Sequence, residues 1–221
     1  MKTSRINGYF YCGGLFLLPI SLLFSSCKKD PVPTVSYEKV EIGSQVWMKK
    51  NLDITWYRNG DLIPEVRDTA EWSKLTTGAW RYPDNDSIKG VIYGKLYNWY
   101  AVKDPRGLAP ADWQVATLTD WEDLLEFLDA TDVIGQTEAA KLLAEGFWNV
   151  PVTPELNQTG FSAVPAGSSF TNSGTDYAYW WTATAGSSDF ARFIVLDGTY
   201  IYNFPFGSVK SNGCSVRCIS K

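Results

Sequence analysis

Residues 113–128 read WQVATLTDWEDLLEFL, and this stretch carries the clearest helix signal in the chain. Thr119 and Glu122 have the spacing of a capping box, in which two side chains satisfy backbone N–H groups at a helix start. The apolar residues that follow recur at i, i+3, i+4 and i+7 and form one stripe: Trp121, Leu124, Leu125 and Leu128. We therefore predict an amphipathic helix with Thr119 as its N-cap.

Two hairpins are predicted outside this helix. Residues 37–48 alternate polar and apolar side chains around Gly43-Ser44, and a two-residue turn that begins with glycine favours type II′. Residues 190–196 and 199–203 flank Asp197-Gly198, which favours a type I′ turn. Both segments therefore predict antiparallel strand pairs joined by tight turns.

Other segments complete a coarse prediction of an α+β fold that is mostly strand and irregular structure. A short second helix is expected from Glu138 to Leu143, capped by Thr137 and ended by Gly146. Residues 91–102 are dense in aromatic and aliphatic side chains and are predicted to be buried, as strand or short helix. Residues 215–219 are predicted to form the final strand.

The N-terminus has the order of features that marks a bacterial lipoprotein signal peptide. Lys2 and Arg5 precede an apolar run over residues 15–24, and small residues lead to Cys27. We expect residues 1–26 to be removed and Cys27 to carry acyl chains, which hold it in a membrane. The alternative is an uncleaved anchor helix, although the apolar run is short for a membrane span.

The expected exported chain consists of a tether over residues 27–37 and a domain over residues 38–221. Removal of Lys2 and Arg5 leaves 20 − 2 = 18 basic residues against 24 acidic ones, a net charge of −6. This acidic balance argues against nucleic acid as a partner. The chain has no histidine, which excludes Ser–His–Asp and Cys–His catalysis and histidine-ligated zinc.

Several motifs in order resemble the Fibrobacter succinogenes major paralogous domain family, over roughly residues 38–220. The matching pieces are residues 42–48 (IGSQVWM) with Asn51-Leu52, residues 93–101 (YGKLYNWYA), residues 113–121 (WQVATLTDW), residues 160–167 (GFSAVPAG), residues 179–184 (YWWTAT) and residues 215–218 (SVRC). The resemblance implies a surface or outer-membrane lipoprotein of Bacteroidota-type bacteria. It also implies a C-type-lectin-like fold with two helices, small twisted antiparallel sheets and long loops, and no established activity.

The chain departs from the family pattern where a loop cysteine and a histidine are common, because Ala109 and Gln114 stand there. If that loop cysteine usually pairs with the C-terminal one, Cys218 lacks its partner. Cys214 lies four residues away, which is ~13 Å along a strand, whereas a disulfide needs Cα atoms within ~7 Å. A bridge between Cys214 and Cys218 would need a bend, and two free thiols are favoured.

Three groups of residues are candidates for binding or chemistry. Tyr177, Tyr179, Trp180 and Trp181 could stack on sugar rings, although most aromatic residues belong to a core and adjacent Trp residues on a strand face opposite sides. Asp84-Asn85-Asp86 offers the oxygen ligands that calcium prefers, but an Asx turn explains it equally well. The helix carboxylates could form an acid/base pair, but capping and solvation account for them: Glu122, Asp123 and Glu126.

These observations favour a non-enzymatic envelope lipoprotein that binds a glycan or a protein at the cell surface, with no cofactor other than, at most, calcium. A second hypothesis is a structural or assembly component without a specific soluble ligand. A polysaccharide-acting enzyme is the third and least favoured hypothesis. It would need a cleft with two carboxylates ~5–10 Å apart.

Overall fold

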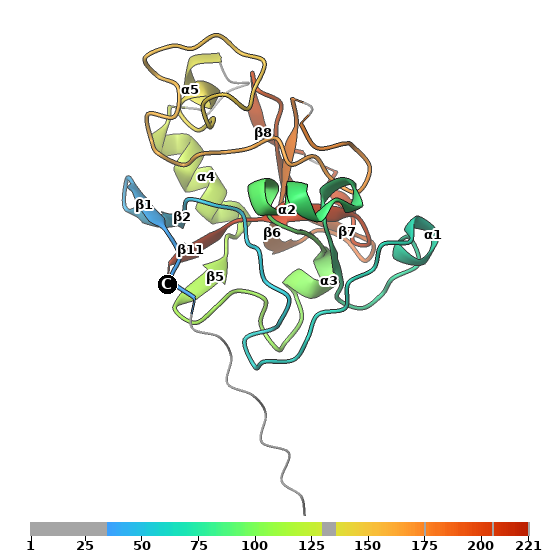
Figure 1. Cartoon of the computed structure of the whole chain (residues 1–221). Coiled ribbons are helices and arrows are strands. Elements are labelled where there is room, and N and C mark those ends of the chain that lie inside the picture. The colour runs from blue at the N-terminus through green and yellow to red at the C-terminus, as the bar shows by residue number, and fades with distance from the viewer. Residues whose placement is uncertain (1–34, 130–135, 175, 205, 221) are drawn as a thin grey trace, which may run out of the picture. The chain divides into compact units, whose positions relative to one another are not determined.

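The computed structural model describes residues 35–220 except 130–135, 175 and 205 (Figure 1), all within the unit Pro31–Lys221. Cys27, the expected signal peptide and most of the expected tether lie outside these residues. The described helices are short: α1 Thr69–Trp72, the 3-10 turn η1 Pro83–Asn85, α2 Ser87–Tyr93, α3 Trp99–Val102, α4 Leu118–Phe127 and α5 Gln136–Ala140. Within the described part of the chain, no helix is both long and apolar enough to cross a bilayer.

A four-stranded sheet joins the start of the described chain to its end. Its order is β1-β2-β11-β5, and all neighbours are antiparallel. The strands are β1 Lys39–Ile42, β2 Gln45–Met48, β11 Cys218–Ser220 and β5 Trp113–Val115. β1 and β2 form the predicted hairpin around Gly43, whose φ of 59° has the sign that a type II′ turn requires there.

A seven-stranded sheet has the order β3-β4-β10-β6-β7-β8, and β9 also pairs with β7. Its strands are β3 Trp80–Arg81, β4 Leu96–Asn98, β10 Gly213–Val216, β6 Ala178–Ala185, β7 Phe190–Leu196, β8 Ile201–Asn203 and β9 Ser208–Val209. β10 and β6 are parallel, so the prediction of antiparallel sheets is wrong for this pair. The mixture of two sheets with a few short helices confirms the α+β fold class.

The predicted final strand over residues 215–219 is two strands in two different sheets. β10 ends at Val216 in the larger sheet, and β11 begins at Cys218 in the smaller one. Arg217 stands between them and is fully buried. The chain therefore crosses from one sheet to the other at a single residue.

The predicted amphipathic helix is present as α4, but its cap is wrong by two residues. Thr117 is the N-cap, and its hydroxyl accepts from the Asp120 N–H (3.2 Å) while the Asp120 carboxylate accepts from the Thr117 N–H (2.7 Å). The Leu118 N–H donates to the Thr184 hydroxyl of β6 (2.9 Å), which fixes the helix start against the sheet. This tertiary contact, absent from the local sequence pattern, decides between the two threonines.

Three further predictions are corrected by the structure. α5 begins at Gln136 and ends at Ala140, so Thr137 lies inside it and cannot be its cap. The connection between β7 and β8 has four residues rather than a two-residue turn, since Leu196 pairs with Ile201 and the Asp197 carboxylate accepts two of the loop N–H groups. The predicted buried segment 91–102 begins with the exposed end of α2 and continues as β4 and α3.

The larger sheet separates two hydrophobic cores. Alternating residues of β6 and β7 face opposite sides, so Trp181 and Phe193 join one core while Trp180 and Ile194 join the other. The stripe on α4 covers the second core through Trp121, as predicted. Both sheet faces are thus buried over most of their area.

Candidate binding sites

The predicted sugar-binding cluster on β6 is largely core. Trp180 and Trp181 are both fully buried, and their indole N–H groups donate to Asn51 and to the Tyr97 carbonyl. Neither ring offers a face to a ligand, because the sheet is covered on both sides. This corrects the prediction for these two residues, and leaves Tyr177 and Tyr179 as candidates.

Tyr177 and Tyr179 begin a row of rings that we call the aromatic groove. The ring centroids of Tyr177 and Tyr179 lie 6.0 Å apart, and the row continues through Phe193 and Phe204 to Phe206, which is 81% exposed. The groove encloses about 330 Å³ and is lined by Phe170, Tyr179, Phe193, Val195, Tyr202, Phe204, Gly207, Ser208 and Asn212. Its surface is dominated by apolar rings, with few polar groups.

Each oxygen-rich side chain of the predicted calcium triplet has a structural partner. Asp84 accepts from Lys89 (2.5 Å) and from the Ser173 hydroxyl (2.6 Å), and these bonds lower its pKa despite partial burial, which alone would raise it. The Asn85 amide donates to a backbone carbonyl, and Asp86 caps α2. Within the described residues no group of three acidic, cysteine or histidine side chains is placed to hold a metal ion.

A hydrogen-bond network around Arg217, called here the Arg217 network, explains why several motif residues occur together. Arg217 Nη1 donates to the carbonyls of Met48 (2.9 Å) and Phe161 (2.8 Å), while Nη2 donates to Asn51 Oδ1 (3.0 Å). Its guanidinium also lies 4.1 Å from the Phe161 ring centroid. These acceptors are neutral, and burial lowers the pKa of Arg217 to about 9. The motifs that include these residues therefore build the core.

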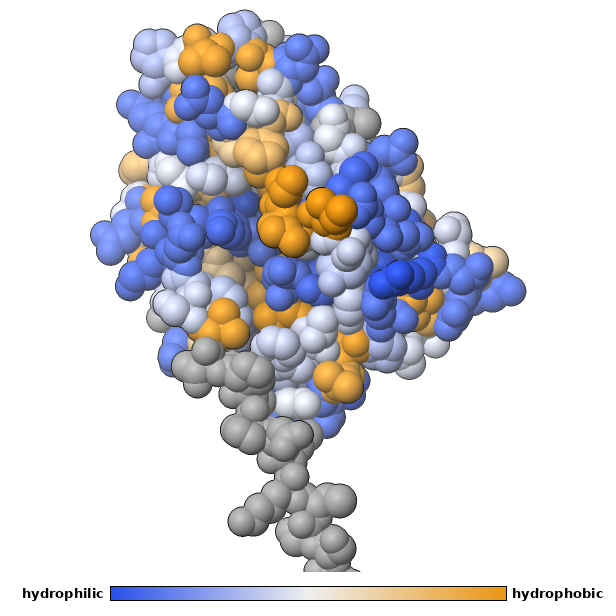
Figure 2. Space-filling view, viewed as in Figure 1, coloured by the Kyte–Doolittle hydropathy of each residue, from blue (hydrophilic) through white to orange (hydrophobic). Residues whose placement is uncertain are grey.

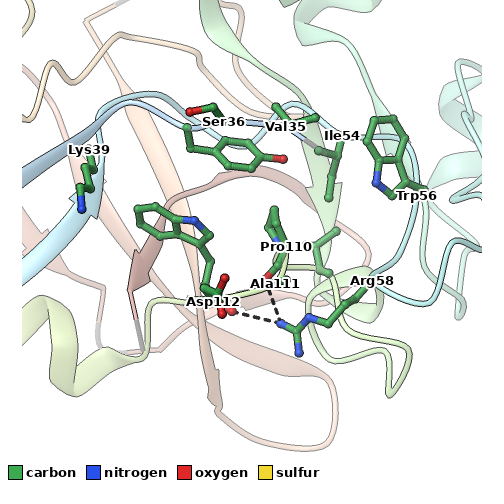
Figure 3. Close-up of a pocket in the computed structure, with 12 residues that line it drawn as sticks. Val35, Ser36, Lys39, Ile54, Trp56, Arg58, Pro110, Ala111 and Asp112 are labelled. Atoms are coloured by element: carbon green, nitrogen blue, oxygen red, sulfur yellow. Dashed lines mark hydrogen bonds between the residues drawn. The ribbon is translucent and has the colours of Figure 1, made fainter. Parts of the chain in front are cut away.

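Another recess, here called the junction cavity, lies elsewhere and encloses about 500 Å³. It forms between the chain entering β1, the segment after β2 and the loop before β5. Figure 3 shows Ser36 and Ile54 on one side and Ala111 and Asp112 on the other. Its lining is Val35, Ser36, Tyr37, Lys39, Ile54, Trp56, Arg58, Leu108, Pro110, Ala111, Asp112 and Trp113.

Aromatic rings and unused polar groups meet in the junction cavity. Tyr37 and Trp113 are half-buried with centroids 6.3 Å apart at 70°, and Trp56 is also half-buried. The described residues offer no hydrogen-bond partner to the Tyr37 hydroxyl, to either indole N–H or to the Asp112 carboxylate. Burial raises the pKa of Tyr37, so its hydroxyl stays protonated and can donate.

Arg58 holds the loop that forms one wall of this cavity (Figure 3). Its Nε donates to the Ala109 carbonyl (3.0 Å), and Nη2 donates to the carbonyls of Pro110 (3.3 Å) and Trp113 (3.0 Å). Its backbone N–H donates to the Gly107 carbonyl (2.7 Å). Because four bonds join one residue to residues 107–113, the loop position depends on Arg58.

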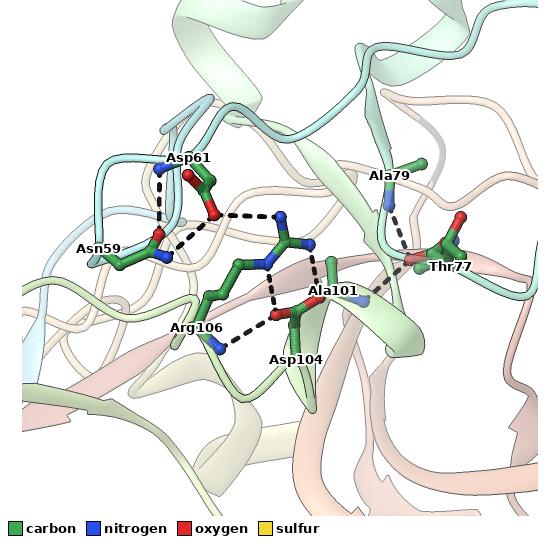
Figure 4. Close-up of polar contacts among 8 residues, drawn as sticks. Asn59, Asp61, Thr77, Ala79, Ala101, Asp104 and Arg106 are labelled. Atoms are coloured by element: carbon green, nitrogen blue, oxygen red, sulfur yellow. Dashed lines mark hydrogen bonds and ion pairs between the residues drawn. The ribbon is translucent and has the colours of Figure 1, made fainter. Parts of the chain in front are cut away.

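Two carboxylates near the junction cavity, Asp61 and Asp104, are held in a structural network. Arg106 bridges Asp104 and Asp61 while Asn59 donates to Asp61, and a separate amide, Asn98, binds Thr77, Ala79 and Ala101. Figure 4 shows both networks. The hydrogen bond from Arg106 lowers the pKa of Asp104. The carboxylates that were candidates for acid/base work, Glu122, Asp123 and Glu126, are exposed on α4.

Cys214 and Cys218 are both free and buried, as favoured from their spacing. Burial raises the pKa of both thiols, to about 12 for Cys218. A high thiol pKa leaves little of the nucleophilic thiolate at neutral pH.

A sequence profile of the Fibrobacter succinogenes major domain matches residues 40–220, most of the chain. The chain belongs to this family. Comparisons with curated proteins and with solved structures gave no match. The predicted family membership is confirmed. In this member of the Fibrobacter succinogenes major domain family, residues of the family motifs form the Arg217 network.

Sequence reasoning missed the site residues Tyr37, Trp56, Arg58 and Trp113. Trp113 was recognised only as part of a family motif. The available signal was weak: Trp56 stands beside Tyr57, just before the turn-forming Arg58-Asn59-Gly60, and the sequence does not distinguish which of the two rings is buried. An aromatic residue in such a loop is a candidate for a binding surface.

Proposed function

We propose that this protein is an exported lipoprotein, anchored through Cys27 in the outer membrane, whose domain binds a saccharide in the junction cavity without catalysis. The supporting observation is the cavity itself, where three aromatic rings surround hydrogen-bonding groups that the protein leaves unused. Pockets of about 300–1,000 Å³ are typical of small-ligand sites. The presence of the first and last described strands, β1 and β11, in one sheet supports a C-type-lectin-like relationship.

Saccharides match this chemistry better than purely apolar ligands do. A pyranose has an apolar face that packs on an aromatic ring and a rim of hydroxyls that need donors and acceptors. Tyr37 and the two indoles supply donors, and Asp112 supplies acceptors. A ligand without hydroxyls would leave these groups desolvated and unpaired, which costs free energy.

A non-catalytic role is supported by the carboxyl groups. A glycosidase needs a proton donor with a raised pKa, and the two described carboxyls whose pKa clearly shifts, Asp84 and Asp104, shift downward. Asp112 is the carboxylate of the junction cavity, and no second one lines it.

Binding is tested with a glycan array and calorimetry on the full chain in detergent. We expect Trp113→Ala to lose at least tenfold in affinity for whichever sugar binds, because the stacking surface is removed. Tyr177→Ala, which removes a ring stacked on Tyr179 beside the aromatic groove, is the matched control and should bind normally. Loss of binding in Tyr177→Ala but not in Trp113→Ala would move the site to the groove, and absence of any sugar ligand would refute the proposal.

The anchor is tested separately from the ligand. Growth with a labelled fatty acid should label the wild-type protein, and Cys27→Ala should abolish the label and release the protein from membranes. Cys12→Ala is the control, because Tyr11 before it lacks the small side chain of a processing site. A mature protein that begins at Met1 would contradict this assignment. Protease shaving of intact cells would show whether the domain faces outward.

Self-assembly is the second candidate function, favoured by two exposed apolar features. Ile88, Val91 and Ile92 of α2 form a patch in which Val91 is 83% exposed, visible as orange atoms in the middle of Figure 2. The aromatic groove is the concave counterpart on the same chain, so one copy could dock on the next. Val91→Glu and Phe204→Glu should each be monomeric by sedimentation but form dimers when mixed. A wild-type chain that is monomeric at high micromolar concentration would exclude this function.

A further inference from the structure

β1 forms one open edge of the four-stranded sheet. The strand order is β1-β2-β11-β5, so one side of β1 pairs with β2, and among the described residues no strand pairs with its other side. β1 is the outermost strand on the left of Figure 1. An edge of this kind presents unpaired backbone groups to which another strand can bond.

The hairpin register shows which backbone groups of β1 are unused. The Lys49 N–H donates to the Glu38 carbonyl (2.9 Å), so these two residues form a hydrogen-bonded pair. Hydrogen-bonded and non-hydrogen-bonded pairs alternate along two antiparallel strands. Lys39 and Glu41 therefore stand in non-hydrogen-bonded pairs with β2. Their backbone N–H and C=O groups point away from β2, toward the open edge.

The side chains of Lys39 and Glu41 give this edge its charge pattern. Both residues are exposed, and the alternation of a strand puts their side chains on the same face. Neither forms an ion pair among the described residues, whereas the neighbouring Glu38 pairs with Lys49 and Lys50 of its own hairpin. The open edge thus carries one positive and one negative side chain on either side of Val40.

We propose that β1 pairs with β1 of a second copy of this chain, antiparallel and centred on Val40. A two-fold axis at Val40 places Lys39 of each copy opposite Glu41 of the other, and opposite charges stabilise a cross-strand pair. In this register the outward backbone groups of the two copies also meet one another. Registers centred on Lys39 or on Glu41 place like charges opposite each other, which is destabilising. The charge pattern therefore selects one register.

Charged side chains on an edge strand commonly prevent pairing with other chains. That protection requires like charges to meet, and the Lys39-Val40-Glu41 edge avoids such a meeting with an antiparallel copy of itself. The contact is isologous and closes at two copies, unlike the contact between the α2 patch and the aromatic groove. It does not depend on the saccharide function. Because Lys39 also lines the junction cavity, Glu41 of the second copy would lie beside that cavity.

The association is measured by sedimentation equilibrium of the full chain in density-matched detergent. Concentrations should reach the high micromolar range, because a strand of 4 residues makes a small interface. We expect the wild type to dimerise, and Lys39→Glu and Glu41→Lys each to dimerise at least tenfold more weakly, because like charges then face each other. Lys74→Glu, an exposed change outside the sheet, is the control and should dimerise normally. A monomeric wild type, or equal dimerisation of all these chains, would overturn the inference.

Charge complementation separates a lost contact from a damaged fold. Lys39→Glu mixed with Glu41→Lys should recover the dimer, because each chain then offers the charges that the other needs. The double variant that carries both changes should recover it alone. Failure of both to recover would overturn the proposed register.

A disulfide tests the register directly. Residues opposite each other in a non-hydrogen-bonded pair have Cα atoms ~4.5 Å apart, which a disulfide can join. Val40→Cys should therefore give a covalent dimer on oxidation. Lys39→Cys is the control, because an offset of two residues puts its Cα atoms beyond ~7 Å from each other. Equal cross-linking of the two variants would overturn the register.

Val91→Glu distinguishes this pairing from assembly through the α2 patch. Val91 lies on α2, outside the four-stranded sheet, so a dimer formed through β1 should persist in this variant. A dimer that is lost in Val91→Glu and retained in Lys39→Glu would assign the association to the α2 patch and overturn the inference.

Discussion

Arg217 places a charge among neutral oxygens at the centre of the domain. Its donors satisfy the carbonyls of Met48 and Phe161 and the side chain of Asn51, which also accepts from Trp180. Burying an ion without a counter-ion is costly unless its hydrogen bonds are complete. The planar fork of Arg reaches all three acceptors at once, and a single ammonium does not.

We predict that Arg217→Lys lowers the free energy of unfolding by about 2–4 kcal/mol, because it leaves buried acceptors unpaired. Urea denaturation measures this loss. Arg67→Lys is the control: its ion pair with Glu65 is exposed, so a much smaller loss than for Arg217→Lys is expected. Equal losses in the two variants would contradict a central role for Arg217.

Asp84 gives the domain a pH-dependent contact. Its pKa is lowered in the fold by Lys89 and Ser173, so the unfolded chain takes up a proton first as pH falls. The stability from this carboxylate is present above the unfolded pKa and is lost as pH drops through the folded one. The stability gap between wild type and Asp84→Asn, measured by urea unfolding, should therefore be constant near neutrality and close in acid. If the stability difference between wild type and Asp84→Asn persisted in acid, it would come from packing rather than from the charge of Asp84.

The buried thiols should be unreactive in the native state. Cys214 and Cys218 are inaccessible, and burial raises the pKa of each. In a chain with Cys12 and Cys27 absent, we expect no reaction with a disulfide reagent at pH 8 until denaturant is added, when two thiols react. Rapid labelling of folded protein would show that this core opens.

Among the elements, α4 shows how a tertiary contact selects between two local signals. Thr117 and Thr119 each stand three residues before an acidic residue, which is the spacing of a capping box. Only a helix that begins after Thr117 places the Leu118 N–H against the Thr184 hydroxyl. We predict that Thr117→Ala costs about 1 kcal/mol of stability through loss of the cap. Thr119→Ala is the matched control on an exposed face and should cost about half a kcal/mol or less. A larger loss of stability for Thr119→Ala than for Thr117→Ala would instead support Thr119 as the N-cap.

Elements with local signals were predictable, and the junction cavity was not. The hairpin at Gly43 and the bounds of β7 follow from alternation and turn residues, which act over short distances. Opposite faces for Trp180 and Trp181 follow from strand geometry, but their complete burial depends on what covers each face. The walls of the cavity come from residues 35–58 and 108–113, which only the folded sheet brings together. No sequence window contains that information.

At the scale of the molecule, the two sheets are joined through Arg217. A chain shortened to end at Val216 would lack β11, and with it the strand that joins β2 to β5. We predict that this chain does not fold cooperatively, as measured by the loss of a sigmoidal urea transition. Replacing Lys221 alone by Ala is the control and should leave the transition intact. A cooperative transition in the shortened chain would show that the larger sheet folds alone.

The place of β11 has a consequence for the time at which the domain can mature. β11 lies between β2 and β5, yet it is synthesised about a hundred residues after β5 (218–220 against 113–115), when residues 39–115 have already been made. The smaller sheet cannot close on a growing polypeptide, so its early strands wait unpaired until residue 220 has been synthesised. For the export proposed here, this order would keep the smaller sheet open until β11 has been made, which suits a chain that crosses a translocation channel unfolded.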